Sequence, residues 1–142
     1  MMSQATDRLR RYMEDELGEC RNEDVQARLE ELGSLERTID EQLSAELDVL
    51  SALASETRYT LVRALVAASE ELCVCELQPL VEVSESGLSH ALSELVEAGI
   101  VEGRKDGRWK KYRATNRAIA IVTVLEGSVG TAATSMEAES DE

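Results

Sequence analysis

The sequence predicts a mainly α-helical protein that carries one β-hairpin, an α+β fold class. Apolar residues recur at steps of three and four along most of the 142 residues, as on one face of a helix. Toward the C-terminal side, strand-like runs flank Asp106-Gly107, a dipeptide typical of the tight turn between antiparallel strands. With no Phe, one Trp and three Tyr, the core must consist mostly of Leu, Val, Ala and Ile side chains.

The N-terminal segment, residues 1–44, is expected to form a helical arm of two or three helices. Gly18 and Gly33 stand where glycines commonly end helices. A long acidic helix with a narrow leucine stripe cannot bury that stripe alone, so we expect the arm to form a homodimer; a solvated surface helix is the alternative. The periodic apolar residues are Leu9, Met13, Leu17, Val25, Leu29, Leu32, Leu35, Ile39, Leu43, Leu47, Leu50 and Leu53.

Three helices are predicted next, within a second domain. Ser55 is a suitable N-cap for a helix over residues 56–69. A short helix covers about residues 74–81, and Ser84 can cap a third helix over residues 85–98. The buried faces are expected to carry Leu61, Val62, Leu65 and Val66 in the first helix and Leu88, Ala91, Leu92, Leu95 and Val96 in the third.

The hairpin and one further helix complete this domain, which we place at residues 45–126. The strands flank a turn at Asp106-Gly107, and an apolar helix begins near Asn116 and fades by Gly127. The small, polar and acidic residues 127–142 are expected to be a disordered acidic tail.

The charge distribution is uneven. The chain has 15 Lys and Arg against 29 Asp and Glu, a formal charge of −14, which taken alone argues against a nucleic-acid binder. Residues 103–117, however, carry seven basic residues and one acidic residue. The hairpin is therefore basic in an acidic protein. The acidic excess, with three Lys against twelve Arg, resembles the halophilic composition of proteins from salt-adapted archaea.

Helix, short helix, turn, helix and basic hairpin is the element order of a winged helix-turn-helix. In that fold the third helix enters the major groove of double-stranded DNA and the hairpin lies along the backbone. A hairpin that is charged only to protect a sheet edge is the alternative. The basic residues expected to contact phosphates are Arg104, Lys105, Arg108, Lys110 and Lys111.

Three cysteines, an odd number, do not suit a disulfide framework, so we expect free thiols that are reactive or bind metal. Cys73 and Cys75 fall at the start of the short helix, where unpaired N–H groups favour a thiolate. Residues i and i+2 of a regular helix point about 200° apart, so both reach one ion only if Cys73 precedes the helix or the first turn is distorted.

These segments together resemble the ArsR/SmtB family of winged-helix, metal-sensing repressors over roughly residues 45–126. The resemblance is carried by ALASETRYTLVRAL, by ELCVCEL with its Cys73-Val74-Cys75 box, and by VSESGLSHALSELVEAGIVEGRKDGRWKKYRA. It implies a homodimeric repressor that releases its operator when a thiophilic ion binds, with terminal helices at the dimer interface. The Ser-x-x-Ser-His signature at Ser86–His90 implies DNA contacts by the recognition helix; we assign Ser86, Ser89, His90 and Ser93 to them.

The number of thiolates bears on the inducing ion. Two thiolates suit a linear soft ion such as Cu(I), whereas trivalent arsenic or antimony prefers three thiolates. Zn(II) and Cd(II) generally prefer four ligands. Gln78 stands where arsenic-responsive relatives often place a third cysteine. Cys20, on the arm, is a tentative third ligand across the dimer, with a buried hydrophobic role as the alternative. We favour arsenite or antimonite as inducer and expect no cofactor for DNA binding.

The same sequence features are compatible with other functions. A regulator of the same shape that senses thiol oxidation or no ligand is the second hypothesis. A dithiol oxidoreductase would need a parallel α/β pattern, which is lacking, so we expect no enzyme. A helical adaptor would not need five basic residues on one ribbon. No run of about 18 apolar residues occurs, so we expect a soluble, cytoplasmic protein without membrane contact.

The predicted recognition helix raises one difficulty. It carries Glu85, Glu94 and Glu97 but no Lys or Arg, and like charge near the groove should weaken binding to DNA. Direct contacts and readout of DNA shape must then contribute more.

Overall fold

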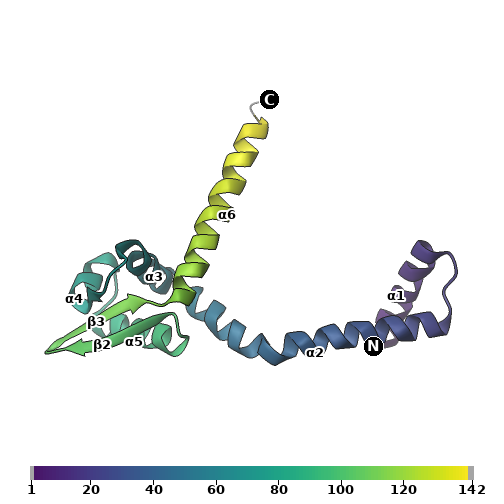
Figure 1. Cartoon of the computed structure of the whole chain (residues 1–142), viewed down its shortest axis with the longest axis horizontal. Helices are drawn as coiled ribbons and strands as arrows, with labels where there is room; N and C mark the ends of the chain where they lie inside the picture. Colours follow the sequence, from purple (N-terminus) through teal and green to yellow (C-terminus); the bar gives the residue numbers. More distant parts are fainter. Residues whose placement is uncertain (1, 141–142) are drawn as a thin grey trace. The chain divides into compact units, whose positions relative to one another are not determined.

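The computed structural model describes the backbone of residues 2–140 and the side chains of residues 4–128. The chain divides into two compact units, Met1–Ala45 and Glu46–Glu142, one residue from the expected boundary. Figure 1 labels the helices α1 to α6 and the strands β2 and β3. Within the described residues, no helix is long and apolar enough to cross a membrane.

The first unit consists of α1 (Met2–Leu17) and most of α2 (Asn22–Leu53). Gly18 ends α1 with a positive φ of 84°, which a residue without Cβ adopts at no steric cost, as predicted. Gly33 does not end a helix, and this prediction is wrong. Its flanks, rich in Leu, Glu and Arg, favour helix strongly enough to offset the cost of one glycine.

The second unit begins with α3 (Glu56–Ala68), followed by the two-residue strand β1 (Leu72–Cys73). The predicted short helix is split into α4 (Val74–Leu77) and a 3₁₀ turn, η1 (Gln78–Leu80). Pro79 explains the split, because it has no N–H with which to continue the α-helical hydrogen bonds.

The third predicted helix is α5 (Glu85–Glu97). The Ser84 hydroxyl accepts a hydrogen bond from the Gly87 N–H at 3.0 Å, and the Ser55 hydroxyl accepts one from the Arg58 N–H at 3.3 Å. Both predicted N-caps are confirmed, because these hydroxyls satisfy N–H groups that the first turn leaves without partners.

The hairpin is formed by β2 (Val101–Asp106) and β3 (Trp109–Ala114). Asp106 pairs with Trp109, so the two-residue turn is Gly107-Arg108 and not Asp106-Gly107. The difference follows from Gly107, which has a φ of 66° and therefore takes the first turn position. β1 adds a third, unpredicted strand antiparallel to β3, in the sheet order β1-β3-β2.

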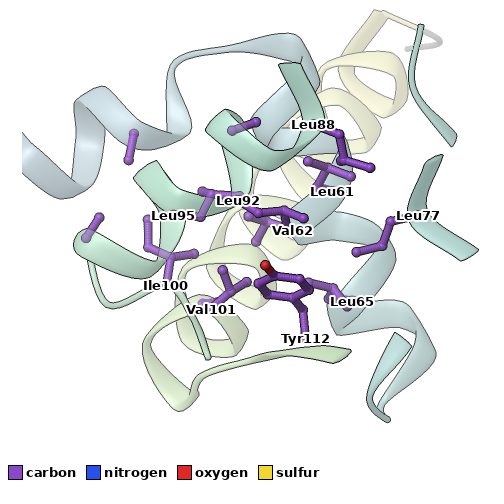
Figure 2. Close-up of a cluster of buried hydrophobic side chains, with 14 of the residues drawn as sticks. Leu61, Val62, Leu65, Leu77, Leu88, Leu92, Leu95, Ile100, Val101 and Tyr112 are labelled. Atoms are coloured by element: carbon purple, nitrogen blue, oxygen red, sulfur yellow. The ribbon is translucent and has the colours of Figure 1, made fainter. Parts of the chain in front are cut away.

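Helices and sheet meet in one aliphatic core, drawn in Figure 2. Leu61, Leu92 and Ile100 are fully buried there, and the Tyr112 ring packs in from β3. A Cβ at Gly103 would lie 2.8 Å from the Tyr112 ring, so the hairpin needs glycine opposite this tyrosine. The core therefore fixes which face of the hairpin points toward the helices.

The last helix, α6, runs over Asn116–Ser140. It begins where predicted, but the expected end near Gly127 is wrong, because the helix continues to Ser140. The disordered acidic tail over residues 127–142 stays a prediction. Ala118 and Val122 anchor the helix in the core, and the following residues, which include no proline, extend it. Residues 141–142 of the predicted tail lie outside the described residues.

Candidate nucleic-acid interface and thiol site

The exposed face of α5 carries the four residues singled out in the sequence. Leu88, Leu92 and Leu95 are buried on the opposite face. The amphipathic pattern thus turns a row of small polar side chains and one imidazole outward, as a helix that reads a groove requires. The row consists of Ser86, Ser89, His90 and Ser93, all exposed.

The outer face of the hairpin, defined as the face turned away from Tyr112, carries ion pairs that the sequence did not predict. Arg104 donates two hydrogen bonds of 2.6 Å to Glu71, the residue before β1. Lys111 lies 3.1 Å from Asp106. A third pair joins Arg113 to Glu102. Arg104 and Lys111, both expected to contact phosphates, are therefore partly neutralised within the chain.

These ion pairs alter the carboxyl groups. Hydrogen bonds from Arg104 hold the pKa of Glu71 below its ordinary value, and the bond from Lys111 does the same for Asp106. Both carboxylates therefore stay charged at neutral pH and keep their basic partners engaged.

The inner face of the hairpin, on the same side as Tyr112, is different. Lys105 and Lys110 pair with each other in the ladder, and in the part of the chain that the structure describes neither forms an ion pair. Lys110 lines a surface hollow of about 290 Å³ together with Ser93 and Glu97 of α5. One inner-face lysine and the last residue of the exposed row of α5 therefore line the same surface hollow.

The hairpin tip adds one more cation. Arg108 lies in the turn, with its guanidinium 5.2 Å from the centre of the Trp109 ring. Cation and ring are both exposed, so the tip presents a stacked cation that can approach a phosphate or a groove.

The two box cysteines converge. Cys73 is the last residue of β1 and the N-cap of α4, with extended backbone angles. Of the two ways in which both sulfurs could reach one ion, the structure therefore has Cys73 before the helix and not a distorted first turn. Its Sγ lies 3.0 Å from the Cys75 Sγ. Since metal–sulfur bonds are about 2.3 Å long, two sulfurs on one ion can be up to about 4.6 Å apart. The pair is therefore already within the span of a single soft ion.

Local hydrogen bonds hold this arrangement. The Cys73 Sγ accepts a hydrogen bond from the Cys75 N–H at 3.5 Å, and the Glu76 carboxylate accepts one from the Cys73 N–H at 2.8 Å. This reciprocal capping fixes the first turn of α4. Cys73 is 7% exposed and Cys75 is exposed, so a ligand reaches the pair from the Cys75 side.

The expectation that the helix start favours a thiolate is wrong for Cys75. Its thiol donates to the Cys73 sulfur, and this hydrogen bond raises the pKa of Cys75 above its ordinary value. A metal cation that binds both sulfurs as thiolates must therefore release thiol protons, so the affinity for a cation should increase as pH rises. With arsenite, As(OH)3, the thiol protons leave as water with the displaced hydroxides.

The segment that carries the thiol pair is tied to the rest of the domain at two places. Cys73 pairs with Lys111 across β1 and β3. Farther along the same segment Gln78, in η1, donates a 2.8 Å hydrogen bond to the Val83 carbonyl, next to the N-cap of α5. Sequence reasoning treated Gln78 only as a missing cysteine and did not identify Glu71 or Glu76, because their partners are distant in sequence or belong to the backbone.

Cys20 follows α1 in the first unit, where its thiol donates weakly to the Arg21 carbonyl at 3.7 Å. It is half-buried. Among the described residues no group of three or more His, Cys, Asp or Glu is placed to hold a metal ion. The second unit thus brings two thiols together, those of Cys73 and Cys75.

Comparisons with known proteins agree with this architecture. The family model described as bacterial regulatory protein, arsR family, matches residues 55–103. A Halobacterium salinarum protein named as an arsenical resistance operon repressor is 52% identical over 125 residues, 87% of this chain and 97% of its own. The arsenical resistance operon repressor of Escherichia coli is 37% identical over 67 residues, 47% of this chain and 56% of its own.

Solved structures share the fold. The transcriptional repressor BigR from Xylella fastidiosa has a TM-score of 0.54 at 30% identity, over 63% of this chain and 91% of its own. NolR from Sinorhizobium fredii has a TM-score of 0.58 at 29% identity, over 64% of this chain and 90% of its own. The predicted winged-helix fold is confirmed, and the relatives named as repressors support a regulator and not an enzyme.

Proposed function

The chain belongs to the ArsR family of transcriptional regulators, and from this premise we propose that it is a repressor released from operator DNA by a thiophilic ion. The ion binds Cys73 and Cys75, with arsenite or antimonite as the favoured inducers. The observation that carries this proposal is the pair of sulfurs 3.0 Å apart, outside the DNA-reading surface but within the same domain.

DNA is held by two parts of one surface. The exposed row of α5, Ser86, Ser89, His90 and Ser93, enters the major groove and reads base edges. Lys105, Arg108 and Lys110 lie along the phosphates. Arg104 and Lys111 contribute less, because acidic neighbours on the outer face already compensate them.

The repressor acts as a homodimer. Large apolar side chains remain exposed along one helix, α2, and burying them against a second copy removes that surface from water. Analytical ultracentrifugation tests this: Leu43→Glu should shift the protein from dimer to monomer. The exposed residues are Leu35, Ile39, Leu43, Leu47 and Leu50.

Release follows from the geometry at the start of α4. Two thiolates on one ion no longer share the S–H···S hydrogen bond that joins Cys75 to Cys73, so the two sulfurs shift and the cap of α4, which the Cys73 sulfur forms, must rearrange. The change passes through η1 and the Gln78 bond toward the N-cap of α5. A 100-fold loss of operator affinity requires about 2.7 kcal/mol of preference of the ion for the released form.

A mobility-shift titration on the protein's own promoter, with arsenite, antimonite, Cd(II), Zn(II), Cu(I) and peroxide, tests the proposal. We expect arsenite and antimonite to release the DNA at the lowest concentrations. Response to Cu(I) alone would identify a linear two-sulfur site. Response to none of the ions would contradict ion sensing.

The number of sulfur ligands decides the role of Cys20. X-ray absorption on the arsenite complex should count three sulfurs if Cys20 of the arm completes the site across the dimer, and two in the Cys20→Ser variant. Two sulfurs in the unmodified protein would leave Cys73 and Cys75 as the whole sensor.

Thiol oxidation is the second candidate, and the short distance between the two sulfurs favours it. Release by peroxide, reversed by a dithiol reductant and absent with arsenite, would select this candidate.

A further inference from the structure

Glu94 of α5 joins two cations. One carboxylate oxygen, Oε2, lies 2.6 Å from the Arg58 Nη1, and the other, Oε1, lies 3.2 Å from the His90 Nε2. His90 stands one helical turn earlier on the same face, at i and i+4 spacing. The carboxylate thus bridges α3 and the exposed row of α5.

Arg58 is itself fixed. Its Nε donates a 2.6 Å hydrogen bond to the Ala52 carbonyl, and its Nη2 donates a 3.2 Å bond to the Ser51 carbonyl, both near the end of α2. The Ser51 carbonyl also accepts the Ala54 N–H at 3.2 Å, whereas Arg58 supplies the bond that the helix end leaves open at the Ala52 carbonyl. Arg58 therefore holds Glu94 in place, because its own position is set by backbone atoms.

This arrangement answers the difficulty that an acidic recognition helix poses. Glu94 is half-buried, and its charge is compensated by Arg58 before DNA approaches. Glu97, by contrast, is exposed and lines the surface hollow that also contains Lys110. The two glutamates thus differ in environment although they lie on the same helix.

The close approach of Nε2 to the carboxylate has a chemical consequence. A neutral imidazole carries one N–H, and a carboxylate oxygen 3.2 Å from Nε2 favours the tautomer with that proton on Nε2. Nδ1 is then left as a hydrogen-bond acceptor on a side chain that is 76% exposed. In the major groove the complementary donors are the exocyclic amino groups of adenine and cytosine.

We propose that Glu94, held by Arg58, is a positioning residue for operator readout that fixes His90 as an acceptor for the amino group of adenine or cytosine. The inference rests on the proposed binding of operator DNA through α5. Judged by its charge alone, Glu94 would only weaken binding to DNA. The inference gives it a role in the choice of DNA sequence.

Binding to the operator and to random DNA tests this role, with Glu97→Gln as matched control. Both Glu94→Gln and Glu97→Gln remove one negative charge, so both should tighten binding to random DNA. Only Glu94→Gln should lower the operator-to-random ratio, by about threefold to tenfold, the effect of one lost hydrogen bond to a base. Equal ratios in the two variants would overturn the proposal.

A double-mutant cycle separates positioning from a general structural effect. In a His90→Ala background, Glu94→Gln should leave the ratio unchanged within twofold, because the residue that it positions is absent. A further drop of the same size as in the unmodified protein would show that Glu94 acts without His90.

His90 is the only histidine, so its ring nitrogens are observable directly. Long-range ¹H–¹⁵N spectra at pH 8 should show the proton on Nε2 in the unmodified protein and a larger share on Nδ1 in Glu94→Gln. Identical spectra would overturn the proposal. A protein that does not distinguish operator from random DNA would instead contradict the proposed function itself.

Discussion

The thiol pair and the inner face of the hairpin differ in how far their chemistry is satisfied within the chain. The Cys75 thiol donates a hydrogen bond to the Cys73 sulfur, and that sulfur also accepts one from the Cys75 N–H in the first turn of α4. Lys105 and Lys110 have no acidic partner among the described residues. A ligand at the thiol pair must break the hydrogen bond between the two sulfurs. A ligand at the lysines displaces no ion pair of the described residues and competes only with the weaker contact of Lys110, 5.8 Å from the centre of the Tyr112 ring. The first arrangement suits a switch and the second suits a docking surface, so the two should be separable by mutation.

The largest expected effect is on the thiol pair. Cys73→Ser with Cys75→Ser should abolish release by the inducer and leave operator affinity within twofold, which produces a super-repressed promoter. Serine is a good N-cap, so α4 should still form. Mobility-shift titration with arsenite measures this. An unchanged inducer response would remove the pair from the mechanism, and a large loss of DNA binding would show that sensor and reader are not separable.

Next in size is a comparison of adjacent lysines on opposite hairpin faces. Lys110→Ala should lower affinity for all DNA sequences and reduce the slope of log affinity against log salt by about one unit, as expected for one lost phosphate contact. Lys111→Ala is the matched control and should change the slope less, because Lys111 is already paired with Asp106. A larger slope change for Lys111 would reverse the assignment of the two faces.

A smaller effect is expected from Ser89 on α5. Ser89→Ala should reduce discrimination between operator and random DNA by a few fold, since one hydrogen bond to a base edge is removed without change of charge. The salt slope should stay constant. Competition binding at two salt concentrations checks both statements, and a changed slope with unchanged discrimination would place Ser89 on the phosphates.

The smallest effect concerns the exposed pair of Glu71 and Arg104. The pKa of Glu71 is lowered in the folded state, so the pair contributes stability above the unfolded-state pKa, about 4.3, and loses it as pH falls through the lower folded value. Urea unfolding of the protein and of Glu71→Gln should differ at pH 7 and converge toward pH 3. A difference that grows at low pH would contradict the sign.

Local patterns in the sequence predicted the elements well. Ser55, Ser84 and Gly18 act at the ends where they were expected, because capping depends on bonds within one helical turn. The errors at Gly33 and beyond Gly127 have the same physical reason. The free-energy cost of one glycine, or of a run of small polar residues, in a helix is smaller than the free energy gained by continuing the adjoining helix. Strand β1 was missed because two residues carry no periodicity.

The sequence by itself determined the helical arm, the caps, the basic hairpin and the position of the two box cysteines, because these features depend on residue type and short spacing. Only the tertiary structure decided which basic side chains of the hairpin and helices have an acidic partner. Glu71 meets Arg104 across 33 residues, and Arg58 reaches Glu94 from another helix. Charge compensation depends on distances through space, and the sequence lists charges without those distances. The fold, by pairing some charges and leaving others exposed, selects the surface available to DNA.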